Sequence, residues 1–298
     1  MTTLESHTPT AAPSHGRAGI RQLIVAEWTK LRSVRSTWVS VLIIVIAGLG
    51  ISALVTNIEA GRWSTLSLAE KLNFDPVRVS QGGVFISQFV VGVLGALLIT
   101  SEYSTGLIRS TLAAVPRRSS LAASKAIVLA GVVFVVGEVT AFASFFLSSA
   151  ILSGHGGKTL PAGYTLADKL RATAAPMLSI TSPGVTAALF RAGLYLTLMA
   201  LLALGIGMVL RHSTGAISLY VGILLIIPLL IQLLPTSITN SIEPKLPSNL
   251  GLAMSETIVR KNDFSGVLMG PWQATLLLVV YAAAALALGT WLLIRRDA

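Results

Sequence analysis

The sequence predicts an all-α integral membrane protein with six transmembrane helices. Hydrophobic residues make up 53% of the 298-residue chain and charged residues only 11%, whereas a soluble domain carries about 25% charged residues. This number of charges is too small to cover the surface of a soluble protein of this size. An ordinary globular enzyme is therefore excluded. The high hydrophobicity also excludes an intrinsically disordered chain. These observations point to the lipid bilayer as the solvent of this chain.

Long runs without a charged residue define the six spans. Each run is near or above the roughly 20 residues that a helix needs to cross a ~30 Å hydrocarbon core. The runs are continuous and do not alternate between apolar and polar residues, which favours helices over a β-barrel. The third run is interrupted by one charge, Glu138. The expected spans cover residues of about 38–55, 84–100, 126–148, 190–210, 215–234 and 273–294.

The N-terminal segment divides into a tail and a domain. Residues 1–19 are rich in Thr, Ser, Pro, Gly and His, which is typical of a disordered tail. Residues 20–298 are expected to form a single six-span domain. The first span is too long for the 7–15-residue apolar region of a signal peptide, so we interpret it as a retained helix.

Basic residues indicate which ends of the helices face the cytoplasm. With the N-terminus inside, that side carries twelve Lys and Arg and the other side ten, and their net charges are +8 and +3. Basic residues collect in cytoplasmic loops of membrane proteins, so both termini are expected to be cytoplasmic. This topology accounts for the net charge of +10, and no nucleic-acid partner is expected.

Motifs for catalysis or cofactor binding are missing. The chain has no cysteine, which excludes disulfides, zinc–thiolate sites and a Cys nucleophile. Gly156-Gly157-Lys158-Thr159 resembles the end of a phosphate-binding P-loop, but Leu152 stands where its first glycine belongs. The four histidines are scattered over the tail and the loops, so no metal cluster is expected. We therefore expect neither an enzyme nor a cofactor in this chain.

Residues 20–35 are expected to form an amphipathic helix at the cytoplasmic membrane surface. Apolar residues recur there at helical spacing, and the basic residues lie mostly off that stripe. The helix could be a simple anchor, with its tryptophan at headgroup depth, or a platform for a cytoplasmic partner. The candidate interface residues are Arg21, Glu27, Trp28, Lys30 and Arg32.

The loop over residues 101–124 is expected to contain a short helix parallel to the membrane. Gly106 permits a turn before it, and Pro116 ends it. The loop could be a basic connector or a knob presented to the cytoplasm. The apolar face of the short helix is expected to comprise Leu107, Ile108, Thr111, Leu112 and Val115.

Two polar residues lie within predicted spans. A charge such as that of Glu138 costs roughly 2.5–3.5 kcal/mol at the centre of a span and usually faces a bundle interior or an aqueous cavity. Glu138 either lines a transport path or subunit interface, or is protonated and bonded to neighbouring hydroxyls. Gln88 is a weaker candidate of the same kind. Arg191, near the outer end of the fourth span, is expected to reach the headgroups.

Several short motifs, spread over nearly the whole chain, carry a family resemblance. Glu102-x-x-x-Gly106 precedes the short helix, and Pro116-Arg117-Arg118 and then Lys125 follow it. The other motifs are EWTKLR at 27–32, LPS at 246–248 and the ending RRDA at 295–298. With these motifs and six spans, the chain resembles the ABC-2 type permease family, especially its small bacterial, actinomycete-like members.

The resemblance implies the membrane half of an ATP-driven exporter in the bacterial cytoplasmic (inner) membrane. Two permeases, identical or sister chains, would pair with two separate ATPase subunits that bind ATP and Mg²⁺, among membrane lipids. The cargo would be a small molecule, drug, antibiotic, peptide or lipid; an ATP-independent secondary carrier or a membrane scaffold is the alternative. The 101–124 loop would be the coupling helix, and residues 20–35 the second ATPase contact. The implied coupling residues are Glu102, Tyr103, Gly106, Arg109, Pro116, Arg117 and Arg118.

Overall fold

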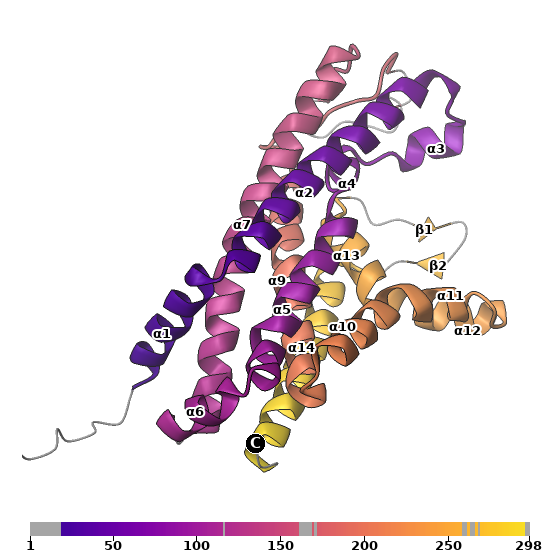
Figure 1. Ribbon diagram of the computed structural model, residues 1–298. Coiled ribbons are helices and arrows are strands. Elements are labelled where there is room, and N and C mark those ends of the chain that lie inside the picture. The colour runs from indigo at the N-terminus through magenta and orange to yellow at the C-terminus, as the bar shows by residue number, and fades with distance from the viewer. Residues whose placement is uncertain are drawn as a thin grey trace, which may run out of the picture.

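The fold is given by a computed structural model, shown in Figure 1. It describes residues 19–115, 117–160, 169, 172–257, 261–262, 266–267 and 269–295. Within these residues, six helices are long and apolar enough to cross a membrane, which confirms the predicted all-α, six-span fold. The β structure in the described part is limited to an antiparallel pair of two-residue strands, β1 (Lys261–Asn262) and β2 (Gly266–Val267), and an isolated bridge between Thr159 and Met177. The predicted tail, except for Gly19, lies outside the described residues.

Each predicted span corresponds to a helix, and most of the helices are longer than predicted. The first span continues into a short 3₁₀ turn, Trp63–Thr65, and the third helix has 37 residues. Hydropathy detects the apolar part of a helix, whereas its hydrogen bonds continue into polar flanks. The spans are α2 (Arg35–Arg62), α5 (Val84–Ser104), α7 (Arg118–Gly154), α9 (Val185–Leu210), the α10–α11 segment (Ser213–Ile231) and α14 (Pro271–Arg295).

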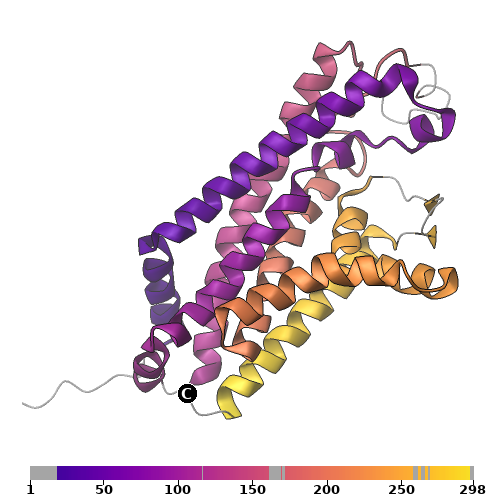
Figure 2. The same ribbon diagram turned by 45° about the vertical axis from the view of Figure 1, so that its right-hand side comes forward.

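The fifth span is kinked, and its second half leaves the bundle. α10 (Ser213–Val221) passes through a π-helical turn, Gly222–Ile226, into α11 (Ile227–Ile231). A π-helical turn and a proline are both recognised causes of helix kinks, and Pro228 is the second residue after the turn. Figures 1 and 2 show this arm running outward across the bundle rather than along it.

The helix α9 forms the centre of the bundle, packed against α5, α7 and α14. In the most apolar stretch of α9, 78% of the residues are buried, whereas the figure for α2 and for α14 is 22%. Small residues allow this close packing. A Cβ atom added to Gly95 of α5 would lie 2.3 Å from the Ala200 carbonyl oxygen, and one added to Gly205 would lie 2.5 Å from the Ala285 carbonyl carbon.

Short helices cover the end of the bundle that lies opposite α6. Asp75 begins one of them, because its Oδ1 accepts the Val77 N–H at 2.9 Å and Pro76 occupies the first turn. Its Oδ2 accepts from the backbone N–H and hydroxyl of Thr257, both at 2.9 Å. These helices are α3 (Leu68–Asn73), α4 (Pro76–Ser80), α12 (Thr236–Ile242), the 3₁₀ turn Glu243–Lys245 and α13 (Pro247–Ser255).

The expectation for Arg191 is wrong. Its side chain is buried and does not reach the headgroups. Its guanidinium donates to the carbonyl oxygens of Met254, at 2.8 Å, and Glu256, at 3.3 Å. These carbonyls lie at the C-terminal end of α13, where a helix lacks its own hydrogen-bond donors. Arg191 therefore fastens α13 onto α9.

The opposite end of the bundle holds two further helices, α1 (Ile20–Ser33) and α6 (Leu107–Ala114). The C-terminal end of α14 lies at this same end, as Figure 1 shows. The helix α1 and the C-terminal end of α14 therefore lie at the same end of the bundle. The expected topology, with both termini on one side of the membrane, requires this.

Candidate functional site

A buried ion network connects three helices at the α6 end. Lys125 of α7 is fully buried, and its ammonium donates to Glu27 Oε2 of α1 at 2.8 Å and to Glu102 Oε1 of α5. Lys30 of α1 donates to the same Glu102 oxygen. Two acids and two bases balance one another, which makes burial of the charges tolerable. The network joins α1, α5 and α7.

Two of the predicted interface residues are therefore internal. Glu102 is 1% exposed and Glu27 is 6% exposed, so neither carboxylate lies on the surface of the described chain. Their role here is to position α1 against α5 and α7. The third charge-free run begins directly after Lys125, so the sequence places this lysine at the end of a span. The sequence alone does not show that Lys125 is buried.

The predicted short helix is confirmed as α6. Gly106 precedes it with φ of 73°, a left-handed conformation that glycine adopts without steric cost. Ile108 and Val115 are buried as expected, but Leu107 is 52% exposed. Consecutive helical residues point about 100° apart, so Leu107 and Ile108 do not share one face. Pro116 lies outside the described residues.

The basic residues around α6 fall into two groups. Arg109 and Arg117 are exposed at the surface. Arg118 instead donates from Nη1 to the Leu293 carbonyl oxygen at 2.9 Å, at the C-terminal end of α14. There a cation also interacts favourably with the helix dipole.

A second arginine holds the same end of α14. Arg211 donates from Nη2 to the Leu292 carbonyl oxygen at 3.1 Å, and its guanidinium lies 5.3 Å from the centre of the Tyr103 ring. The Tyr103 side chain is half-buried. Tyr103, a predicted coupling residue, thus packs against the arginine that joins the end of α9 to α14.

The helix α1 is amphipathic, as predicted. Leu23 and Leu31 are buried on the same face as Glu27. The remaining predicted residues of this segment point outward: Arg21, Trp28 and Arg32 are exposed, and Lys30 is half-exposed.

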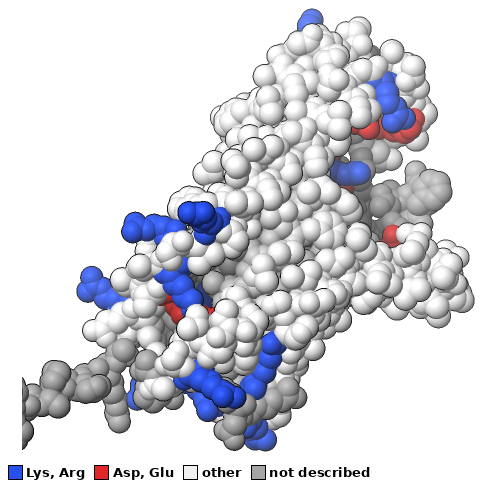
Figure 3. Space-filling model, viewed as in Figure 1, with Lys and Arg blue, Asp and Glu red and all other residues white. Residues whose placement is uncertain are grey.

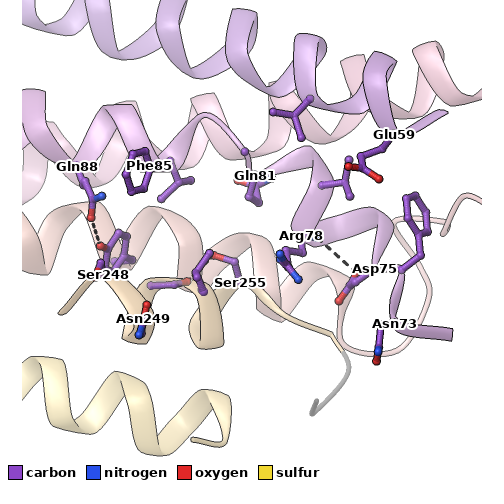
Figure 4. A pocket seen from close by; sticks show the side chains of 18 of the residues that line it. Glu59, Asn73, Asp75, Arg78, Gln81, Phe85, Gln88, Ser248, Asn249 and Ser255 are labelled. Atoms are coloured by element: carbon purple, nitrogen blue, oxygen red, sulfur yellow. Dashed lines mark hydrogen bonds between the residues drawn. The ribbon is translucent and has the colours of Figure 1, made fainter. Parts of the chain in front are cut away.

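A large cavity opens on the other half of the bundle, between α2 and α5 on one side and α11 and α13 on the other. Its volume is about 880 Å³, within the usual range for small-molecule sites. Gln88 lies at one end of the cavity, and Glu59 and Asp75 lie at the other (Figure 4). The walls between them are mostly apolar, formed by Val55, Phe85, Leu224, Leu225, Leu229 and Leu252.

Hydrogen bonds fix Gln88 at the inner end. The Tyr195 hydroxyl donates to Gln88 Oε1, and the Tyr220 hydroxyl donates to the Gln88 carbonyl oxygen at 2.8 Å. Gln88, a predicted transport-path residue, therefore lies on a cavity wall together with Tyr195. The single sequence offers no signal for the cavity itself, because its walls come from helices that are far apart along the chain.

Charged residues of both signs line the outer end of this cavity. Arg62 lies 4.0 Å from Glu59, and Arg78 lies 3.9 Å from Glu256. Hydrogen bonds from the Ser67 hydroxyl and backbone N–H hold the pKa of Glu70 below its usual value. An apolar body with a mixed-charge mouth suits an amphiphilic molecule whose polar group stays at the mouth.

A small cavity with several hydroxyl groups in its lining lies between α2, α5, α7 and α9. Its volume is about 10 Å³, roughly the room that one water molecule needs. Ser52, Ser87, Thr140 and Ser144 line it, together with Gln81, which also lines the large cavity. These hydroxyls and the amide supply the polar partners that a buried water requires.

Glu138 does not line the large cavity. Its carboxylate lies against α9, where a Cβ added to Gly193 would come within 2.4 Å of Oε1. Among the described residues this buried oxygen has no hydrogen-bond partner, so the expected hydroxyl bond to it is not found there. The half-buried Glu138 thus has one buried carboxylate oxygen without a partner within the described part of the chain.

The segment that resembles a P-loop is a helix cap. Gly156 has φ of 81°, and the Gly157 N–H donates to the Leu152 carbonyl oxygen at 2.9 Å. Such bonds satisfy the last carbonyls of α7, whereas a P-loop leads into the start of a helix. No group of three acids or histidines within the described ranges could hold a metal ion.

Comparison with known proteins agrees with this arrangement. The sequence model of the ABC-2 family transporter protein matches residues 23–207. Comparison with curated proteins gives no match. The matched region covers more than half of the chain and runs from α1 into α9, so it includes the ion network, α6 and the Gln88 end of the cavity. This multi-span membrane protein therefore belongs to the ABC-2 transporter family.

Proposed function

We propose that this chain is the permease subunit of an ATP-driven exporter in a bacterial cytoplasmic membrane. Separate ATPase subunits bind at the α6 end, which is cytoplasmic, and hydrolyse ATP with Mg²⁺. A second permease, identical or a sister chain, completes the transporter. The cargo is an amphiphilic small molecule, antibiotic, peptide or lipid that occupies the large cavity.

The exposed side of α6 carries this proposal. Leu107 and Arg109 present an apolar and a basic side chain outward, and Arg117 follows after the helix. Figure 3 shows blue surface gathered over this end of the molecule. An exposed apolar residue among cations is typical of a surface that docks into a partly acidic groove of a partner.

The helix α5 supports transmission of force from this end to the cavity. It carries Glu102 of the ion network near one end and Gln88 of the cavity near the other. Fourteen residues of helix span about 21 Å. A displacement of α6 by ATP-driven closure of the ATPases would therefore move α5 as a lever and shift the cavity wall.

Co-purification tests the proposal. The tagged chain is extracted from its native membrane in mild detergent, and bound proteins and ATP hydrolysis are measured. We expect a stoichiometric ATPase with the native chain and its loss in the double variant Arg109→Glu/Arg117→Glu. Lys158→Glu, an exposed charge reversal at the other end of α7, is the matched control and keeps the ATPase.

Two results would contradict the proposal. An ATPase that stays bound and active with the double variant would exclude α6 as the contact. A native chain that purifies without any ATPase would favour a carrier or scaffold instead. Arg118 is left unchanged because its substitution would also uncap α14.

A further inference from the structure

An apolar groove lies where α1 and α2 meet and faces α7. The chain bends between the two helices at Val34, which is extended. The groove has a volume of about 390 Å³, and Gly131 of α7 forms part of its floor. A Cβ added to Gly131 would meet nothing within 4 Å. The apolar side chains that line it include Ile24, Leu31, Val41, Ile127, Val132 and Val135.

Two tryptophans mark the depth of this groove in the membrane. Trp28 and Trp38 both line it and are both exposed. Tryptophan is enriched at the level of the lipid headgroups. The Trp38 indole N–H donates to the Arg32 carbonyl oxygen at 2.9 Å, which closes the bend. The groove thus begins at the membrane interface and runs along α7 into the apolar layer.

The mouth of the groove is basic. Arg32 lines it, and Arg35 is exposed at the start of α2. The acid of α1, Glu27, points away into the ion network, where Lys125 binds it. The charge at the mouth is therefore positive, and it complements an anionic headgroup.

We propose that this groove binds an anionic phospholipid, with one acyl chain along α7 and the phosphate at Arg32 and Arg35. The apolar floor suits an acyl chain, and the two tryptophans place the mouth among the lipid headgroups. A bound lipid would brace α1 against α7 beside the ion network. The site is independent of the ATPase contact proposed above, because it faces the bilayer.

Native mass spectrometry of the delipidated full chain tests the site. Dioleoyl phosphatidylglycerol and dioleoyl phosphatidylcholine, which share their acyl chains, are titrated in parallel. We expect phosphatidylglycerol to bind more tightly, by about fivefold for each arginine that contacts it. Arg32→Gln/Arg35→Gln should abolish this preference while retaining phosphatidylcholine binding.

A matched pair of glycine substitutions tests the groove itself. Gly131→Leu fills the floor and should lower the affinity for both lipids. Gly50→Leu is the control, because Gly50 lies on α2 outside the groove and also has open space around it. Equal binding of the two lipids to the native chain would overturn the proposal. So would equal lipid affinity of the two leucine variants, once their elution in size-exclusion chromatography shows both to be folded.

Discussion

Replacing Lys125 by methionine is expected to destabilise the protein strongly. The change leaves the carboxylates of Glu27 and Glu102, whose side chains are 8% and 1% exposed, without the cation between them. Lys30 remains as a partner for Glu102 alone. Removing one partner from a buried ion pair costs about 3–5 kcal/mol. At 2–4 °C per kcal/mol, the unfolding temperature should fall by roughly 6 °C or more.

Heating in detergent, followed by tryptophan fluorescence, measures this shift. Dyes that react with thiols are unsuitable, because the chain has no cysteine. The double variant Lys125→Met/Glu27→Gln leaves one acid, Glu102, facing Lys30, and should recover part of the loss because the charges balance again. Lys158→Met removes an exposed lysine and should leave the unfolding temperature unchanged.

Either of two unfolding temperatures would refute this prediction. An unfolding temperature of Lys125→Met equal to that of Lys158→Met would show that the network adds nothing to stability. A double variant that is less stable than Lys125→Met would show that Glu27 contributes through contacts other than its charge.

Two further predictions concern topology and the intramembrane acid. Ser110 and Ser153 are exposed at opposite ends of the bundle. In intact cells, a membrane-impermeant maleimide should label the variant Ser153→Cys and leave Ser110→Cys unlabelled. Labelling of Ser110→Cys would reverse the proposed orientation. Glu138→Met should stabilise the chain by about 1–3 kcal/mol, the cost of a buried polar group without a partner, as thermal unfolding would measure. A lower unfolding temperature would mean that the carboxylate has a partner which methionine cannot replace.

The spans and α6 were predictable because their signals are local. A run without charge marks the apolar part of a helix wherever it packs, and this is why all six spans were found. Gly106 similarly marked the start of α6, since its turn conformation depends on the glycine itself. The helix bounds differ most for α7, whose polar first turns continue the helix before residue 126.

The contacts between helices were not predictable from the single sequence. Lys125 and Glu27 are 98 residues apart, and Arg118 and Leu293 are 175 residues apart. The count of basic residues on each side of the predicted spans could not separate exposed arginines from those that cap helices. Burial of a charge depends on the partner that a distant helix supplies.

The short connections of α6 determine how a force on it would spread. Thr105 and Gly106 alone separate it from α5, and residues 115–117 separate it from α7. Connections this short leave little slack, so a displaced α6 must move the adjoining ends of both helices. The ion network already fastens these ends to each other and to α1, and Arg118 adds α14. We infer that α5 and α7 move together at this end and that α10, which the Tyr220–Gln88 hydrogen bond joins to α5, follows them. The Gln88 wall of the cavity then shifts against α11, which lies beyond the kink.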